Sequence, residues 1–203
     1  MKKRTSTIKR KTKETQISVR LVIGGEGRSK IDTGIGMLDH MLELFSFHGL
    51  FDLDVFARGD LKVDIHHTNE DVGIVLGDAF KKALGEKKGI KRFGSISVPM
   101  EDVVANVVID ISGRGFFNGI KAQTGKLPKI DKDQGYSFEY ANHFFEAFAK
   151  RLGMNLDISV CSFNPDLHTN LEPIFKALGI ALDQATVIDP RRKGIPSTKG
   201  VID

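Results

Sequence analysis

The sequence predicts an α+β protein made of two similar halves, each a small sheet with two helices on one face. Three observations lead to this prediction. A pattern of histidines and glutamates occurs twice, apolar residues recur at helical spacing, and others alternate as they do in strands. At 203 residues the chain can form two small halves that share one core. Packing the halves together with the helices inward, between the sheets, buries the apolar face of every helix.

The repeat is clearest around the histidines. Residues 39–45 match residues 142–148 in their His, in the Glu three residues on and in the Phe two further. Residues 66–70 match residues 168–172 in their first His and their Glu. Both matches are about one hundred residues apart, which indicates two copies of one structural unit. The expected organisation is a first half over residues 1–92, a second half over 93–188 and a C-terminal tail over 189–203.

Periodicity places the helices and strands within each half. Helical spacing of apolar residues predicts helices over 37–47, from 72 to the glycine at 85, near 137–151 and near 169–185. Alternation predicts strands over 17–23, over 51–57 with a continuation to 65, over 103–111 and near 154–161. Residues 118–135 are interpreted as a mobile surface loop outside the repeat. The tail is expected to be either disordered or ordered by a ligand.

The composition is that of a soluble globular protein without a membrane-spanning segment, at 40% hydrophobic and 28% charged residues. Much of the net charge of +4 lies in the first thirteen residues. We interpret these as a solvated first strand with a frayed end; nucleic-acid binding ranks second because no aromatic residue accompanies the charges. No secretory signal follows. The single cysteine, Cys161, excludes an internal disulfide, so we expect a cytoplasmic protein that binds neither nucleic acid nor membrane.

Any one histidine would be interpreted as a core or surface residue, but five of the six fall on repeat positions. His66 and Glu70 share a helical face and can approach one ion. His67 is rotated by about 100° and would serve a second metal, with ligands drawn from different elements or subunits. Imidazole and carboxylate suit Mn, Fe, Zn, Co or Ni, and the sequence does not choose among them. Asp71 is better explained as a residue that caps the helix or compensates its dipole.

These residues lie within motifs that closely resemble those of the imidazoleglycerol-phosphate dehydratases, a family that acts in histidine biosynthesis. The motifs cover nearly the whole chain and are residues 10–15, 38–42, 48–51, 66–71, 88–94, 110–114, 174–178 and 195–201. The resemblance implies two halves of the ribosomal-protein-S5-domain-2-like type, each with a four-stranded sheet and two helices. It also implies a homo-oligomer, a 24-mer built from trimers, with two Mn ions per active site at subunit interfaces.

The resemblance further assigns roles to individual residues. Glu14 matches the acid–base glutamate of the family. The implied metal ligands are His40, His66, His67, Glu70, His143, His168 and Glu172. The implied phosphate-binding residues are Arg92, Arg114, Lys176, Ser197 and Lys199. The implied reaction converts D-erythro-imidazoleglycerol phosphate to imidazole acetol phosphate and water through a metal-bound imidazolate, which pushes out a poor leaving group and makes a weakly acidic C–H proton removable.

The second half departs from the family pattern. The family has two adjacent histidines in this motif, whereas this chain has His168 followed by Thr169, so one metal site should lose a donor. Three interpretations follow: a water completes the depleted site of an active enzyme, the substrate or metal has changed, or the protein is a non-catalytic relative retained for oligomeric assembly. We favour the first, because Glu14, both arginines and the tail are retained.

Overall fold

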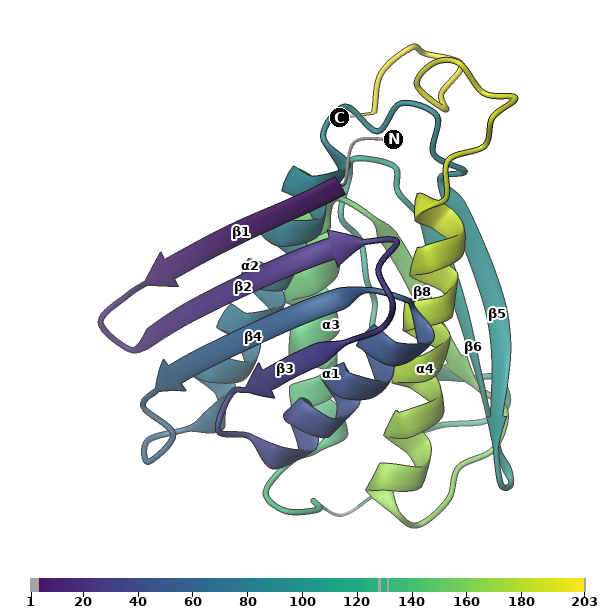
Figure 1. Ribbon diagram of the computed structural model, residues 1–203. Helices are drawn as coiled ribbons and strands as arrows, with labels where there is room; N and C mark the ends of the chain where they lie inside the picture. Colours follow the sequence, from purple (N-terminus) through teal and green to yellow (C-terminus); the bar gives the residue numbers. More distant parts are fainter. Residues whose placement is uncertain (1–3, 128, 131, 203) are drawn as a thin grey trace.

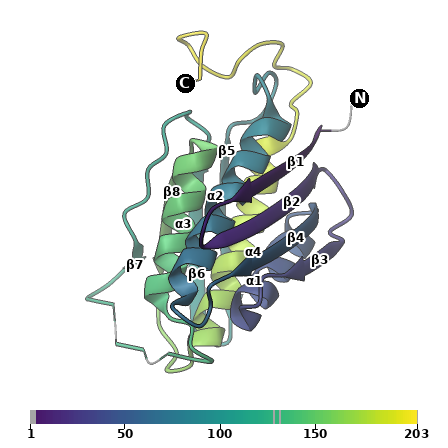
Figure 2. The same cartoon turned by 90° about the vertical axis from the view of Figure 1, so that its left-hand side faces the viewer.

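The computed structural model describes residues 4–127, 129–130 and 132–202. Two four-stranded sheets lie on either side of four helices, as both views show (Figure 1; Figure 2). This arrangement confirms the predicted α+β fold with the helices between the sheets. Within the described residues, none of the helices is both long and apolar enough to cross a membrane.

The first half contains four strands and two helices. Its elements are β1 (Arg4–Lys11), β2 (Thr15–Ile23), β3 (Ser29–Asp32), α1 (Gly36–His48), β4 (Asp52–Gly59) and α2 (Ile65–Leu84). The strand order is β1-β2-β4-β3, in which β3 and β4 are parallel and the other neighbours antiparallel. Buried residues alternate with more exposed ones along β2, as predicted, so one face of the strand packs on the core.

The second half repeats this plan. Its elements are β5 (Phe93–Met100), β6 (Val103–Asp110), β7 (Ile120–Ala122), α3 (Phe138–Leu152), β8 (Asn155–Val160) and α4 (Leu167–Thr186). The order β5-β6-β8-β7 again has one parallel pair, β7 with β8. The division into halves after residue 92, and the separation of the tail after residue 188, remain predictions.

Two expectations about local structure are wrong. Residues 118–135 do not lie wholly outside the repeat, because β7 corresponds to β3; a strand of three residues is too short for alternation to signal. The strand expected to continue to residue 65 ends at Gly59, and α2 begins at Ile65. There the Asp64 side chain accepts a hydrogen bond from the His66 amide, and such a cap favours a helix start despite the alternating apolar residues.

The helices of the two halves pair across the core: α2 packs on α3, and α4 packs on α1. A glycine at the same repeat position allows each close approach. A Cβ on Gly77 would lie 2.8 Å from the Phe148 carbonyl oxygen, and a Cβ on Gly179 would lie 2.5 Å from that of Phe45. The repeated glycine thus brings each motif helix against a helix of the other half.

The tail folds back over the C-terminal end of α4, at the top of Figure 1. Gly194 accepts a hydrogen bond from the Gly89 amide, and the Pro196 carbonyl accepts one from the Arg92 guanidinium. The described part of the tail is therefore held by contacts with the rest of the chain.

Candidate metal centre

The pairing of α2 with α3 brings three of the predicted ligands together. His66 and His143 face each other with their Nδ1 atoms 2.9 Å apart. His66 Nε2 lies 3.4 Å from Glu70 Oε2, one turn further along α2. The three side chains line a depression of about 250 Å³ together with Glu146 and Lys150. We call His66, Glu70 and His143 the α2–α3 cluster.

The pairing of α4 with α1 brings the corresponding predicted ligands together, with the parts played by the two halves exchanged. His168 Nε2 lies 2.9 Å from Glu172 Oε2, and His40 Nε2 lies 3.7 Å from the same oxygen. One potential ligand atom from each residue lies within 4.8 Å of the others, a spacing that can hold a metal ion. We call His40, His168 and Glu172 the α1–α4 cluster. Each cluster thus takes a histidine–glutamate pair from one half and a histidine from the other.

His67 belongs to neither cluster in this chain. Its ring centroid lies 6.1 Å from that of His66, and its Nδ1 lies 3.0 Å from Asp60 Oδ2. The hydrogen bond with Asp60 raises the pKa of His67, and the negative charge of Glu14 adds to the effect. Its Nε2 is the nitrogen not engaged with Asp60, and a second metal at His67 stays a prediction.

Thr169 stands at the repeat position of His67 and has a structural role. Its backbone amide and its hydroxyl both donate to Asp166 Oδ2, each at 2.7 Å, at the start of α4. These bonds lower the pKa of Asp166, so the cap stays charged near neutral pH. Thr169 is a buried residue held by the Asp166 N-cap of α4, and it contributes no imidazole.

Charges around the α1–α4 cluster add a contact that the repeat does not predict. Lys176 Nζ lies 2.5 Å from Glu172 Oε1. Burial raises the pKa of Glu172, but hydrogen bonds from Lys176 and His168 outweigh it, so the net shift is downward. His48, at the end of α1, has a lowered pKa because of burial and the nearby Lys176 charge. His48 is the one histidine without a repeat partner, so the repeat does not predict that it lies near the site.

Glu14, the predicted acid–base residue, lies in the turn between β1 and β2. It lines an open depression with Arg58 and Asp60, on the side of the molecule that carries His67. Glu14 is exposed, so its carboxylate is accessible to exchange protons with a substrate.

The predicted phosphate-binding residues separate into two places. Lys176 lies beside the α1–α4 cluster, whereas the Arg92 amide donates to the Ala185 carbonyl near the far end of α4. At 1.5 Å per residue, Ala185 lies about 25 Å from His168. The Arg92 side chain pairs with Asp110 at 2.6 Å, which raises its pKa, and contacts the tail that carries Ser197 and Lys199.

Arg114 follows β6 at the same end of the second sheet. Its amide donates to the Ser112 hydroxyl at 3.2 Å, and the adjacent Gly113 amide donates to Gly153 at the end of α3. The tail itself is tightened by a bond from the Lys199 amide to Ser197 Oγ. Arg92 and the tail with Ser197 and Lys199 therefore lie beyond the far end of α4, whereas Arg114 lies beside the end of α3.

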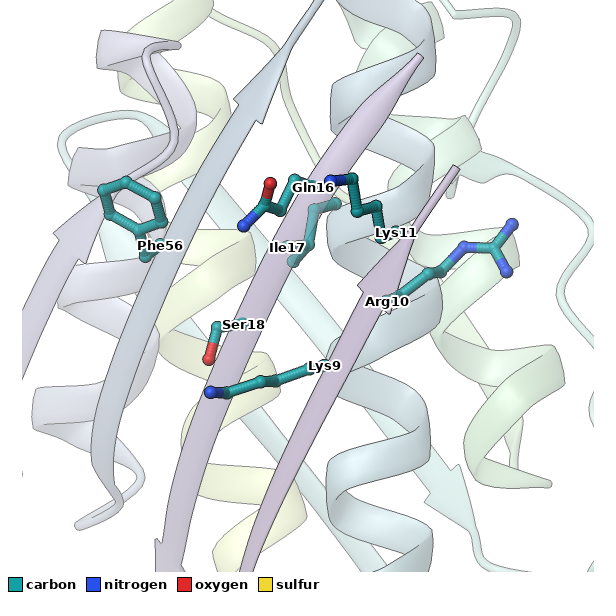
Figure 3. Close-up of a pocket in the computed structure, with 7 residues that line it drawn as sticks. All are labelled: Lys9, Arg10, Lys11, Gln16, Ile17, Ser18 and Phe56. Carbon is teal, nitrogen blue, oxygen red and sulfur yellow. The ribbon is translucent and has the colours of Figure 1, made fainter. Parts of the chain in front are cut away.

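A wider depression of about 530 Å³ lies on the outer face of the first sheet and is drawn in Figure 3. Its lining is basic and polar, with Lys9, Lys11 and Gln16 beside the exposed Phe56. Among the described residues, no histidine or carboxylate lines it, so the donors suited to a metal lie at the helix clusters instead.

The fold and the two clusters define a duplicated α+β protein whose facing helices present paired histidine–carboxylate sites suited to divalent metals. A family model described as imidazoleglycerol-phosphate dehydratase matches residues 33–182. The chain belongs to this family, which confirms the resemblance seen in its motifs.

Relatives extend the match to nearly the whole chain. The imidazoleglycerol-phosphate dehydratase of Pelobacter propionicus is 49% identical over 98% of this chain and 99% of its own length. That of Geobacter metallireducens is 50% identical over 97% and 98%. Among solved structures, the Staphylococcus aureus enzyme is 31% identical with a TM-score of 0.76, covering 91% of this chain and 99% of its own. The Pyrococcus furiosus enzyme, in complex with (S)-C348, is 34% identical with a TM-score of 0.79, covering 96% and 99%.

Proposed function

We propose that this protein dehydrates D-erythro-imidazoleglycerol phosphate to imidazole acetol phosphate and water, the step of histidine biosynthesis that gives its relatives their name. The observation that carries the proposal is the pair of histidine–glutamate clusters, formed by equivalent residues of the two halves. Family membership supplies the substrate, and the clusters supply donors suited to the chemistry.

Two divalent ions per active site, Mn in our proposal, suit the imidazole and carboxylate donors of the clusters. Bound there, the ions supply Lewis acidity that makes the substrate imidazole easier to deprotonate. His40, His168 and Glu172 would hold one ion; His66, Glu70 and His143 would hold the other. Lys176 keeps Glu172 ionised, which is the form that binds a cation.

Glu14 is the group proposed to move protons. Its carboxylate removes the weakly acidic C–H proton, and the same group donates a proton to the hydroxyl, which leaves as water. The exposed turn that carries it can meet a bound substrate without a rearrangement of the sheet.

The geometry favours an active site shared between copies of the chain. A substrate of this size cannot contact both Arg92 and the α1–α4 cluster of one chain, because about 25 Å separate them along α4. We therefore propose that Arg92, Arg114, Ser197 and Lys199 bind the phosphate next to the metal clusters of another subunit. Charge-assisted hydrogen bonds from arginine suit phosphate oxygens. His67, which lies outside both clusters of its own chain, would complete an ion site of another copy. A 24-mer built from trimers is the proposed assembly.

Thr169 leaves one ion with fewer imidazoles than the other. We propose that a water completes this site and that the enzyme is active. The competing proposal is a metal-binding assembly protein without catalysis, and the commitment of Thr169 to a helix cap is the observation that favours it. We also propose a cytoplasmic location and no nucleic-acid partner, consistent with one cysteine and a basic first strand free of aromatic residues. Retention of the protein on DNA or RNA at physiological salt would contradict the second point.

The test is direct. Purified protein with added Mn²⁺ should release imidazole acetol phosphate from imidazoleglycerol phosphate. Glu14→Gln should lower kcat by about 10³-fold, in the middle of the range for general acid–base catalysis, without changing the circular dichroism spectrum. Absence of turnover with any divalent metal would overturn the proposal. Size-exclusion chromatography before and after chelation, run beside the assay, separates the alternative, which predicts metal-dependent assembly with no product.

A further inference from the structure

We infer that Asp71 is a positioning residue, which acts through Thr15 to fix the Glu14 turn against the first turns of α2. The inference rests on the proposed function, because it is Glu14's part in proton transfer that gives the position of this turn its importance. Asp71 directly follows Glu70 of the α2–α3 cluster, so one segment of helix would set both a metal ligand and the acid–base residue.

The Asp71 carboxylate joins the first two strands to α2. Its Oδ2 accepts a hydrogen bond from the Thr15 hydroxyl at 2.5 Å, and its Oδ1 accepts one from Arg10 Nε at 3.1 Å. The side chain is 12% exposed, so water competes little for these bonds. Capping α2 or compensating its dipole requires neither of these contacts. Those two roles therefore do not explain the bonds of Asp71 to Thr15 and Arg10.

The bonds continue from Thr15 to the backbone of Glu14. Thr12 Oγ1 lies 3.2 Å from Thr15 Oγ1 and accepts hydrogen bonds from the amides of Glu14, at 3.1 Å, and Thr15, at 3.0 Å. A hydroxyl has one proton and two lone pairs. Since Thr15 gives its proton to Asp71, the Thr12 hydroxyl must donate to Thr15, and its two lone pairs then receive the two amides.

The proton of each threonine hydroxyl is therefore used, and the charged carboxylate of Asp71 fixes the direction of this chain of bonds. The consequence for catalysis is geometric. A displacement of a reacting group by about 1 Å can cost about 10²-fold in rate. Glu14 lies in an exposed turn, so its position relative to α2 depends on this chain rather than on burial.

A second hydroxyl provides a matched control. Ser6 Oγ, on the same strand as Arg10, donates to the Ala79 carbonyl of α2 at 2.7 Å and is buried. It ties the same strand to the same helix, but two to three turns away from Asp71. Loss of either hydroxyl should weaken packing, whereas only the loss at Thr15 should displace Glu14.

The experiment compares Thr15→Val with Ser6→Ala in the Mn-loaded enzyme. Thr15→Val should lower kcat by about 10- to 100-fold, with KM for substrate and Mn per subunit unchanged. Ser6→Ala should stay within about threefold of wild type, and Thr15→Ser should restore most of kcat because it keeps the hydroxyl. In a Glu14→Gln background, Thr15→Val should cause no further loss. Equal kcat for Thr15→Val and wild type, or full additivity with Glu14→Gln, would overturn the inference.

Hydrogen exchange of the metal-loaded protein provides a readout that does not depend on turnover. Thr15→Val should speed exchange in a peptide covering residues 12–16, and Ser6→Ala should not. If wild type fails to turn over but this difference is seen, the proposed function fails while the bond chain stands; if exchange is unchanged, the inference itself fails. Thr12→Val serves if Thr15→Val does not fold, because Thr12 lies in the turn and supplies the same acceptors to the Glu14 amide.

Discussion

The two clusters contain the same residue types at equivalent positions, yet their surroundings differ. The Glu70 side chain in the α2–α3 cluster is 48% exposed, whereas the Glu172 side chain in the α1–α4 cluster is 14% exposed. Glu172 is also paired with Lys176, and the repeat places Ile74 at the position equivalent to that lysine. Duplication therefore preserved the donors, while neighbours outside the repeat pattern determine how each carboxylate is solvated and charged.

The second residue of each motif differs as well. In the first half it is His67, held by Asp60; in the second it is Thr169, held by Asp166. Each half thus has an acid that binds this position, although Asp60 and Asp166 are not equivalent in the repeat, and only the first half has an imidazole there. We expect two ion sites of unequal affinity.

Removing one histidine from either cluster should have the largest effect. His66→Asn and His168→Asn should each lower kcat/KM by about 10³-fold or more, because loss of a bound ion removes several kcal/mol of transition-state stabilisation. Metal analysis should show about one ion per subunit lost in each variant. Wild-type turnover in either one would mean that its cluster is not part of the catalytic site.

Restoring the missing imidazole should have an intermediate effect. Thr169→His should tighten the weaker of the two Mn sites by about tenfold or more, since imidazole is a better ligand than water or a hydroxyl. Thr169→Val is the control, because it removes the bond from the Thr169 hydroxyl to Asp166 without adding a metal donor and keeps the backbone cap bond. Competition with a chelator under equilibrium conditions measures both affinities. Two equal sites in the wild-type protein would remove the asymmetry on which this expectation depends.

Sequence patterns predicted the donors better than they predicted the contacts. The repeat identified both histidine–glutamate pairs and the matching His40 and His143, because duplication preserves residue types at fixed spacing. It did not indicate that α4 packs on α1 and α2 on α3, since periodicity identifies the buried face of a helix but not its neighbour. The glycines at positions 77 and 179 were part of the repeat, but their role depends on helices that meet only in the fold.

Other features gave no signal in the sequence. β7 is too short to show alternation, and His48 approaches Lys176 through tertiary packing alone. Arg92 lies far from the clusters because it directly precedes β5 and its amide binds the Ala185 carbonyl near the end of α4. Roles carried over from the family name these residues without placing them. The resemblance implies active sites at subunit interfaces, and the distance of Arg92 from the clusters of its own chain supports that proposal.

The smallest expected effect separates the two acids by their pH dependence. In metal-free protein, Asp60→Asn should lower the Tm at pH 5.5 and change it little at pH 8.5. Asp60 raises the pKa of His67 in the folded state. The stabilisation is therefore fully present below the unfolded pKa, about 6.5, and is lost as pH rises through the raised folded value. Thr169→Val should lower the Tm by the same amount at both values, because Asp166, whose pKa is lowered, stays ionised throughout. A pH-independent Asp60→Asn effect would show that the His67 contact is not an ion pair, and the two acids would then have the same structural role.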